Sequence, residues 1–219
     1  SFTTPLISAT TNYYVAAENV VPINATIGMG SLTSSSYESP FYHLFGGLKS
    51  QYLIRASELQ AAGLSAGLIN ELGINVDLAN NTFNDLNISI GTTSLNALTT
   101  TFVSGLTNVY YNAAYSPAAG INIFTFTTPF LWDGLSNIII EFCWSNNNTG
   151  GTGSTVKYDN TSFVSEAYYR ADNQPANVLC GTTTAYSTQS KRPQFLINET
   201  NICSSPRVEV TATVGASTP

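Results

Sequence analysis

The chain has 219 residues, 43 % of them hydrophobic and only 9 % charged, with a formal net charge of −6 at pH 7. A chain of this size can bury a sizeable core, and Ser, Thr and Asn must supply much of its polar surface, as in many extracellular β proteins. It has no basic patch for phosphates and no apolar run of the roughly 18 residues that span a membrane. We therefore expect no nucleic-acid partner and no membrane insertion.

Strand-like segments follow one another along the chain and are separated by turn residues. The first covers residues 11–17, and the last, at 207–214, alternates apolar and polar side chains with period two. The central segments expected as strands are residues 52–56, 67–79, 86–91, 107–115, 121–128, 138–144, 155–158 and 193–197. This spacing, with turn signals such as Asp133-Gly134, predicts an all-β sandwich or jelly roll.

One short helix is expected after the first central strand. Ser57 and Gln60 stand three residues apart, as the N-cap and N3 residues of a capping box do. Gly63 is suited to the left-handed conformation that ends many helices. We interpret this helix as a structural plug between strands and not as a site.

The chain contains three cysteines. Cys143 and Cys180 flank a polar stretch rich in Gly and Asn, and a disulfide between them is favoured over the other pairings. Cys203 is then left over, with a partner expected outside this chain. With a single histidine and no Cys-x-x-Cys pattern, a zinc site is a poor interpretation.

Two stretches carry a family resemblance. Residues 50–59 (SQYLIRASEL) are followed by 68–76 (LINELGINV), and residues 124–134 (FTFTTPFLWDG) are followed by 136–143 (SNIIIEFC). Together they resemble a β-sandwich module of the giant surface and gliding-type adhesins of Bacteroidota, which are typically exported by the type IX secretion system. The resemblance implies an extracellular, cell-surface location.

The two ends resemble a different unit of the same proteins. Residues 2–16 resemble the penultimate strand, and residues 203–214 the last strand, of an Ig-like repeat whose two final strands are normally joined by a short hairpin. The resemblance implies a jelly-roll-like β-sandwich inserted between the last two strands of a partial Ig-like domain, because an exposed hairpin tip accepts insertions easily. It also implies that Cys203 pairs with a cysteine in an early strand of that repeat.

The expected domain boundaries follow from this insertion. Residues 1–19 hold the penultimate Ig-like strand, residues 20–202 the inserted sandwich, and residues 203–219 the last Ig-like strand and the start of a linker. We expect residues 11–17 and 207–214 to pair as antiparallel neighbours, separate from the main sandwich.

No constellation of residues indicates catalysis. His43 lies among aromatic residues, without a nucleophile signature to accompany it. Asp133 and Glu141 are formally a pair of carboxylates such as glycosidases use, but Asp133 precedes Gly134 as in a turn and Glu141 lies within a predicted strand. We therefore expect no enzymatic activity.

Aromatic and amide side chains are the better candidates for ligand contact, since sugars stack on aromatic rings and amides bind their hydroxyl groups. The candidate glycan contacts are Trp144, Asn146, Tyr168, Tyr169 and Asp172. The alternative is that these aromatic residues fill the core of the sandwich.

The scattered aspartates leave one alternative open for a metal. They lack the spacing of a calcium loop, so only a structural calcium bound by loop carbonyls and one or two acids remains an option, and no other cofactor is expected. The aspartates are Asp77, Asp85, Asp133, Asp159 and Asp172.

The resemblance and the lack of a catalytic constellation together predict a non-enzymatic extracellular module of a large cell-surface adhesin or filament. Such a module would mediate attachment or act as a repeat spacer. Its expected partners are surface glycans or neighbouring repeats or subunits of the same protein. The alternative is a carbohydrate-binding module of a secreted multidomain enzyme.

Overall fold

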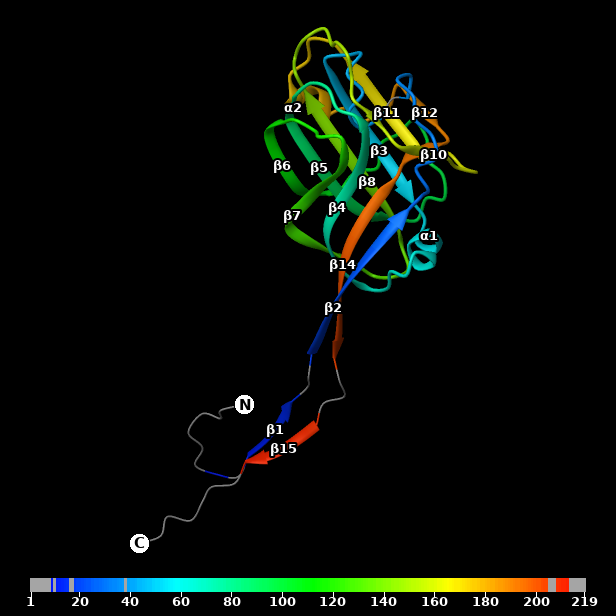
Figure 1. The fold of residues 1–219 in the computed structure, drawn as a ribbon. Coiled ribbons are helices and arrows are strands. Elements are labelled where there is room, and N and C mark those ends of the chain that lie inside the picture. Colours follow the sequence, from blue (N-terminus) through cyan, green and yellow to red (C-terminus); the bar gives the residue numbers. More distant parts are fainter. Residues whose placement is uncertain (1–8, 10, 16–17, 38, 205–207, 213–219) are drawn as a thin grey trace. The chain divides into compact units, whose positions relative to one another are not determined.

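The fold is shown in Figure 1 as a computed structural model, which describes residues 9, 11–15, 18–37, 39–204 and 208–212. The chain divides into two compact units: Ser1–Val21 together with Asn201–Pro219, and Pro22–Thr200. The strands are β1 (Thr11–Val15), β2 (Glu18–Ile27), β3 (Gly47–Ile54), β4 (Gly67–Leu78), β5 (Phe83–Thr93), β6 (Thr107–Tyr115), β7 (Gly120–Trp132), β8 (Asn137–Ser145), β9 (Thr155–Val156), β10 (Tyr158–Asn160), β11 (Glu166–Ala171), β12 (Ser187–Gln189), β13 (Lys191–Pro193), β14 (Phe195–Ser204) and β15 (Val208–Ala212). The helices are α1 (Ala56–Ala61) and α2 (Ala176–Cys180).

Two sheets make up most of the larger unit. The first has the strand order β12-β11-β3-β8-β5-β6, and the second has the order β2-β14-β4-β7, with β9 also paired to β4. The ladders within both sheets whose registers are resolved are antiparallel. The prediction of an all-β sandwich is confirmed.

The strand pairing is nested along the chain. β5 pairs with β6, β4 with β7, β3 with β8 and β2 with β14, so each pair encloses the one before it. Apart from the β5–β6 hairpin, these strands alternate between the two sheets in chain order. A long antiparallel hairpin rolled up in this way is a jelly roll.

The core lies between the two sheets because their strands alternate apolar and polar side chains. In β5, Leu86, Ile88 and Ile90 are fully buried in this core, whereas Asn87 and Ser89 point to the opposite face of the sheet. At about 25 cal/mol per Å² of apolar surface, this large aliphatic and aromatic cluster is the main source of stability.

A second, smaller hydrophobic cluster covers part of the outer face of the first sheet. Leu53 and Ile139 project outward there and meet Leu98 and Phe102 from the segment that joins β5 to β6. The side chain of Gln51 holds this segment to the sheet, because it donates to the carbonyl of Val103 and accepts from its N–H, both at 2.8 Å. The cover reaches β8 at Ile139 and β5 at Gly91, beside which Leu106 lies.

Helix α1 begins two residues earlier than the sequence predicted. Its N-cap is Arg55 and its N3 residue is Glu58, whose Oε2 accepts the Arg55 backbone N–H at 2.9 Å. The prediction of Ser57 as N-cap is therefore wrong, because the Glu58 carboxylate accepts a backbone N–H better than an amide does and is also bonded to Arg192. Gly63 follows the helix with a φ of +94°, as expected.

Strands β1 and β15 form an antiparallel pair. Thr11 is opposite Ala212 and Val15 is opposite Val208, and the two strands form a two-stranded sheet of their own. This confirms the predicted pairing of the terminal segments, of which residues 16–17, 207, 213 and 214 lie outside the described part of the chain. The Ig-like identity of these ends remains a prediction.

Candidate functional site

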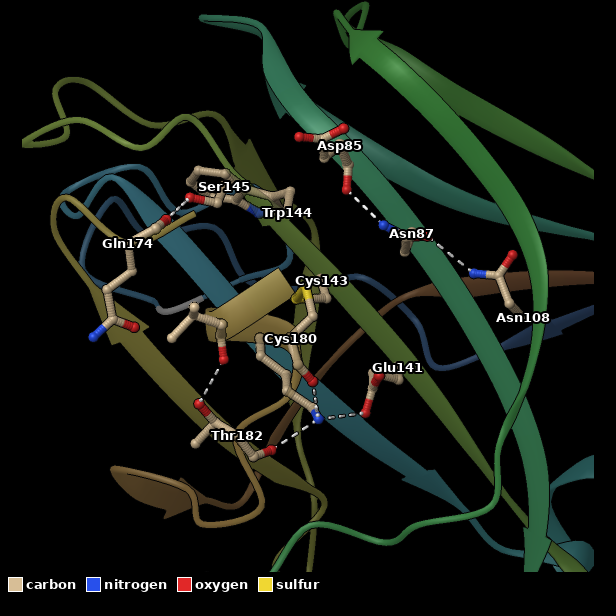
Figure 2. The surroundings of a disulfide bond; sticks show 12 residues. Asp85, Asn87, Asn108, Glu141, Cys143, Trp144, Ser145, Gln174, Cys180 and Thr182 are labelled. Atoms are coloured by element: carbon tan, nitrogen blue, oxygen red, sulfur yellow. Dashed lines mark hydrogen bonds and ion pairs between the residues drawn. A yellow bond between two sulfur atoms is a disulfide. The ribbon is translucent and has the colours of Figure 1, made fainter. Parts of the chain in front are cut away.

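A groove of about 520 Å³, lined mainly by polar side chains and called the polar groove below, lies on the outer face of the first sheet over residues of β8, β5 and β6. Figure 2 shows part of it, with Asn87, Asn108 and Glu141 on one side of the disulfide that joins β8 to α2. The groove is lined by Asp85, Asn87, Ser89, Asn108, Tyr111, Glu141, Cys143, Pro175, Ala176, Asn177 and Cys180.

The floor of the groove follows from the strand register. Asn87 of β5 is opposite Cys143 of β8 on one side and Tyr111 of β6 on the other. Side chains that are directly opposite on one face lie about 5 Å apart, so they form a continuous row across the sheet. The next row is Glu141, Ser89 and Asn108.

One wall of the groove is α2, which a disulfide holds against the sheet. Cys143 is bonded to Cys180, with Cα atoms 5.8 Å apart, which confirms the predicted disulfide. Lys49 reinforces the attachment, because its Nζ donates to the carbonyls of Cys180 and Thr182 at 2.8 and 2.9 Å. Leu179 of α2 is fully buried.

A chain of hydrogen bonds orients the polar side chains on the floor. Tyr111 Oη donates to Asp85 Oδ1 at 2.9 Å, which raises the pKa of the tyrosine hydroxyl. Asn87 Nδ2 donates to the Asp85 carbonyl at 2.8 Å, and Asn108 Nδ2 donates to Asn87 Oδ1 at 3.2 Å (Figure 2). Side chains fixed in advance lose less entropy when a ligand binds.

Glu141 is the second carboxylate of the groove. Burial raises its pKa, and the neighbouring Lys49 and Gln51 act in the opposite direction. Lys49 Nζ lies 3.4 Å from Glu141 Oε2, which also accepts from Gln51 Nε2 at 2.7 Å. Lys49 is thus engaged by Glu141 and two carbonyls, and none of the described lining residues is a lysine or arginine.

Trp144, the first of the predicted glycan contacts, is fully buried in the core between the sheets. Its Nε1 donates to the Pro40 carbonyl at 2.7 Å. The prediction that Trp144 contacts a glycan is wrong, because it occupies an inward position of β8 while Cys143 points outward. Asn146 is structural, since its amide bonds His43, the Thr82 carbonyl and the Asn84 N–H.

The other predicted contacts lie away from the groove, on and after β11. Tyr168 is only 7 % exposed, and its ring is 6.3 Å from that of the exposed Tyr186. Tyr169 packs against the outer hydrophobic cluster, and Asp172 accepts the Gly46 N–H at 2.8 Å. The structure therefore does not unite the predicted contacts in one site.

The residues considered for catalysis have different structural roles and do not form a common site. His43 is buried, with its ring near Phe83 and Trp144, and burial lowers its pKa. Asp133 accepts the N–H groups of Leu135 and Ser136 in the turn before β8, and its bonds to Ser136 lower its pKa. Asp133 thus has the turn function expected from its sequence context.

Among the described residues, no group of three or more His, Cys, Asp or Glu side chains is placed to hold a metal ion. Asp159, one of the aspartates considered for calcium, instead accepts the N–H groups of Met29, Gly30 and Ser31. No described helix is long and apolar enough to cross a membrane. The side chain of Cys203 lies outside the described part of the structure, so its pairing remains a prediction.

Comparison of the chain with protein families, with curated proteins and with solved structures finds no match.

Asn87, Asn108 and Tyr111 were not identified by sequence reasoning. A weak signal was present in residues 83–90 (FNDLNISI), where polar residues alternate with buried ones. That alternation identifies an outward row on one strand. The neighbouring polar positions on β6 and β8 become evident only with the strand register.

Proposed function

We propose that this chain is a non-enzymatic extracellular attachment module that binds glycans in the polar groove. The observation that carries the proposal is the lining of the groove, which combines a row of amides and carboxylates with the ring of Tyr111, itself 55 % exposed. Amides and carboxylates bind sugar hydroxyls, and an exposed tyrosine ring offers an apolar face to the C–H groups of a sugar.

The groove is suited to binding rather than to turnover. Its polar groups are held by one another, and Glu141 is bonded to Lys49 and Gln51. Glycoside hydrolysis uses two carboxyl groups, and both carboxylates of the groove are engaged by neighbours, since Asp85 also accepts the hydroxyl of Tyr111. An open surface lined mainly by hydrogen-bonded polar side chains fits recognition of an extended polysaccharide.

The setting agrees with a location outside the cell. A disulfide persists in oxidising compartments and is rare in the cytosol. Binding of surface glycans is the event that an adhesin module needs, and the same groove would serve a carbohydrate-binding module of a secreted enzyme.

A glycan array probed with the full chain tests the proposal. We expect binding to a set of oligosaccharides, with affinities measured by titration calorimetry. Substitution of Asn87 and Asn108 by Ala should weaken binding about tenfold or more, because each lost bond costs about 1 kcal/mol or more. The matched control is Asn160→Ala, an exposed asparagine of β10 outside the groove. No binding to any glycan, or equal losses in both variants, would contradict the proposal.

A further inference from the structure

We infer that the groove selects neutral sugars over anionic ones, and that Asp85 and Tyr111 set this specificity. The inference rests on the proposed glycan-binding function and names the class of ligand. The charged side chains among the described lining residues are the carboxylates of Asp85 and Glu141. The nearby Lys49 is occupied by Glu141, by two carbonyls and by the ring of Phe102, whose centroid is 4.8 Å from Nζ.

A carboxylate or sulfate on a sugar would therefore meet the carboxylate of Asp85, which no described cation pairs, beside Glu141, whose charge Lys49 balances. Coulomb repulsion between like charges a few ångströms apart is strong where water is partly excluded. The whole chain, with its net charge of −6, adds to this repulsion at longer range. A neutral sugar has no such penalty and can donate its hydroxyl hydrogens to both carboxylates.

The backbone conformation of Asp85 also points to a functional role. Asp85 has a φ of +53°, in the left-handed region that non-glycine residues rarely adopt, although Asp and Asn tolerate it better than others. This conformation occurs inside β5. Asn84 and Leu86 have partners on β6 in the described register, and Asp85 between them has none. Strained conformations of this kind concentrate at functional sites, where they aim a side chain.

The carboxylate of Asp85 orients the ring of Tyr111. Tyr111 Oη donates to Asp85 Oδ1, while Asp85 Oδ2 has no hydrogen bond to a described residue. One carboxylate oxygen therefore orients the aromatic ring, and the other is free to accept a sugar hydroxyl beside that ring. A sugar stacked on Tyr111 would place its hydroxyls between Asp85 and Asn87, which are bonded to each other.

The test compares matched pairs of oligosaccharides, one of neutral hexoses and one in which uronic acids replace them, together with an amino-sugar oligomer. The protein is the full chain and its variants Asp85→Asn, Tyr111→Ala, Tyr111→Phe and Tyr186→Ala. Asn keeps the left-handed backbone and removes only the charge. Tyr186 is a matched control, because it is 64 % exposed and lies outside the groove.

We expect the unmodified chain to bind the neutral oligomer at least about tenfold more tightly than the uronate, which corresponds to about 1.4 kcal/mol. Asp85→Asn should reduce this preference several-fold. Tyr111→Ala should abolish binding, Tyr111→Phe should retain most of it, and Tyr186→Ala should bind normally. The melting temperature of each variant shows that it is folded.

Binding of the protonated amino-sugar oligomer at least as tight as that of the neutral oligomer supports the inference, because the same carboxylates attract a cation. Equal or tighter binding of the uronate overturns the inference while leaving the proposed function intact. Unchanged binding in Tyr111→Ala also overturns it. Binding of none of the oligomers, in a chain that also fails on the broad array, overturns both the inference and the proposed function.

Discussion

Trp144 and Cys143 are neighbours in the chain but face opposite sides of the first sheet. Trp144 is buried between the sheets, and Cys143 contributes to the floor of the polar groove. A tryptophan beside a run of asparagines resembles a sugar-binding surface in sequence, yet its position on the strand places it in the core. Successive side chains of a strand face opposite sides, so only one of the two neighbours can be buried. Which of them is buried depends on the side of the sheet on which the core lies.

Substitution of Trp144 by Phe should therefore reduce stability and leave ligand binding unchanged. The change removes the bond to the Pro40 carbonyl and leaves a buried acceptor without a donor, at a cost of about 1–3 kcal/mol. Denaturant unfolding measures the loss, and calorimetry with a glycan from the array measures binding. Lost binding at full stability would show that Trp144 is a contact after all.

His43 makes the stability of the protein depend on pH near neutrality. Burial lowers its pKa below the ordinary value of 6.5 and outweighs the negative charge of Asp172, which acts in the other direction. The folded protein thus binds fewer protons than the unfolded chain as the pH falls through this range. Stability contributed by neutral His43 is present above about pH 6.5 and is lost below it.

We predict that the melting temperature falls between pH 7.5 and pH 5.5 more in the unmodified chain than in His43→Gln. Gln keeps an acceptor for the Asn146 amide, which bonds His43 Nε2 at 3.1 Å, but it does not titrate. Glu141 and Glu199 have raised pKa values and act with the opposite sign in both proteins. Identical pH profiles for the two proteins would refute the assignment to His43.

At the scale of single elements, α2 depends on long-range contacts. It has only five residues, which is too short for a helix to be stable alone. The disulfide, the buried Leu179 and the two bonds from Lys49 hold it on the sheet. The position of this wall of the groove therefore depends on these contacts.

Removing the disulfide by the double substitution Cys143→Ser and Cys180→Ser should destabilise the protein by about 4 kcal/mol, since the bond closes a loop of 37 residues. The amides of α2 should exchange with solvent faster than those of β5, because α2 loses its covalent attachment and β5 does not. Denaturant unfolding and hydrogen exchange provide the two measurements. Unchanged exchange in α2 would mean that Lys49 and Leu179 suffice to hold the wall.

Elements with a strong local pattern were predicted well, and elements that depend on pairing were not. The segment predicted at residues 107–115 coincides with β6, and the one at 67–79 differs from β4 by one residue. β11 was missed because Glu166 and Arg170 interrupt its apolar pattern. Glu166 accepts a hydrogen bond from Gln189, and the Arg170 guanidinium lies over the ring of Phe45. β2 was missed because Pro22 weakens its strand pattern, and α2 because five residues show no helical period.

At the scale of the whole molecule, the nested pairing explains why the site escaped sequence reasoning. The polar groove is assembled from three strands and a helix that are far apart in the chain, and their alignment depends on the register of β5 against β6 and β8. The disulfide was predictable because only a few pairings exist among three cysteines. The amide row required the register, which the sequence does not encode locally.

The central claim is that the polar groove binds glycans. Its most direct test is a titration of the isotope-labelled chain with a neutral oligosaccharide from the array, followed by backbone amide chemical shifts in NMR spectra. The account predicts that the shift changes centre on residues 85–89, 108–111, 141–143 and 176–180. Changes centred on the β11–β12 side, at Tyr168 and Tyr186, would contradict it.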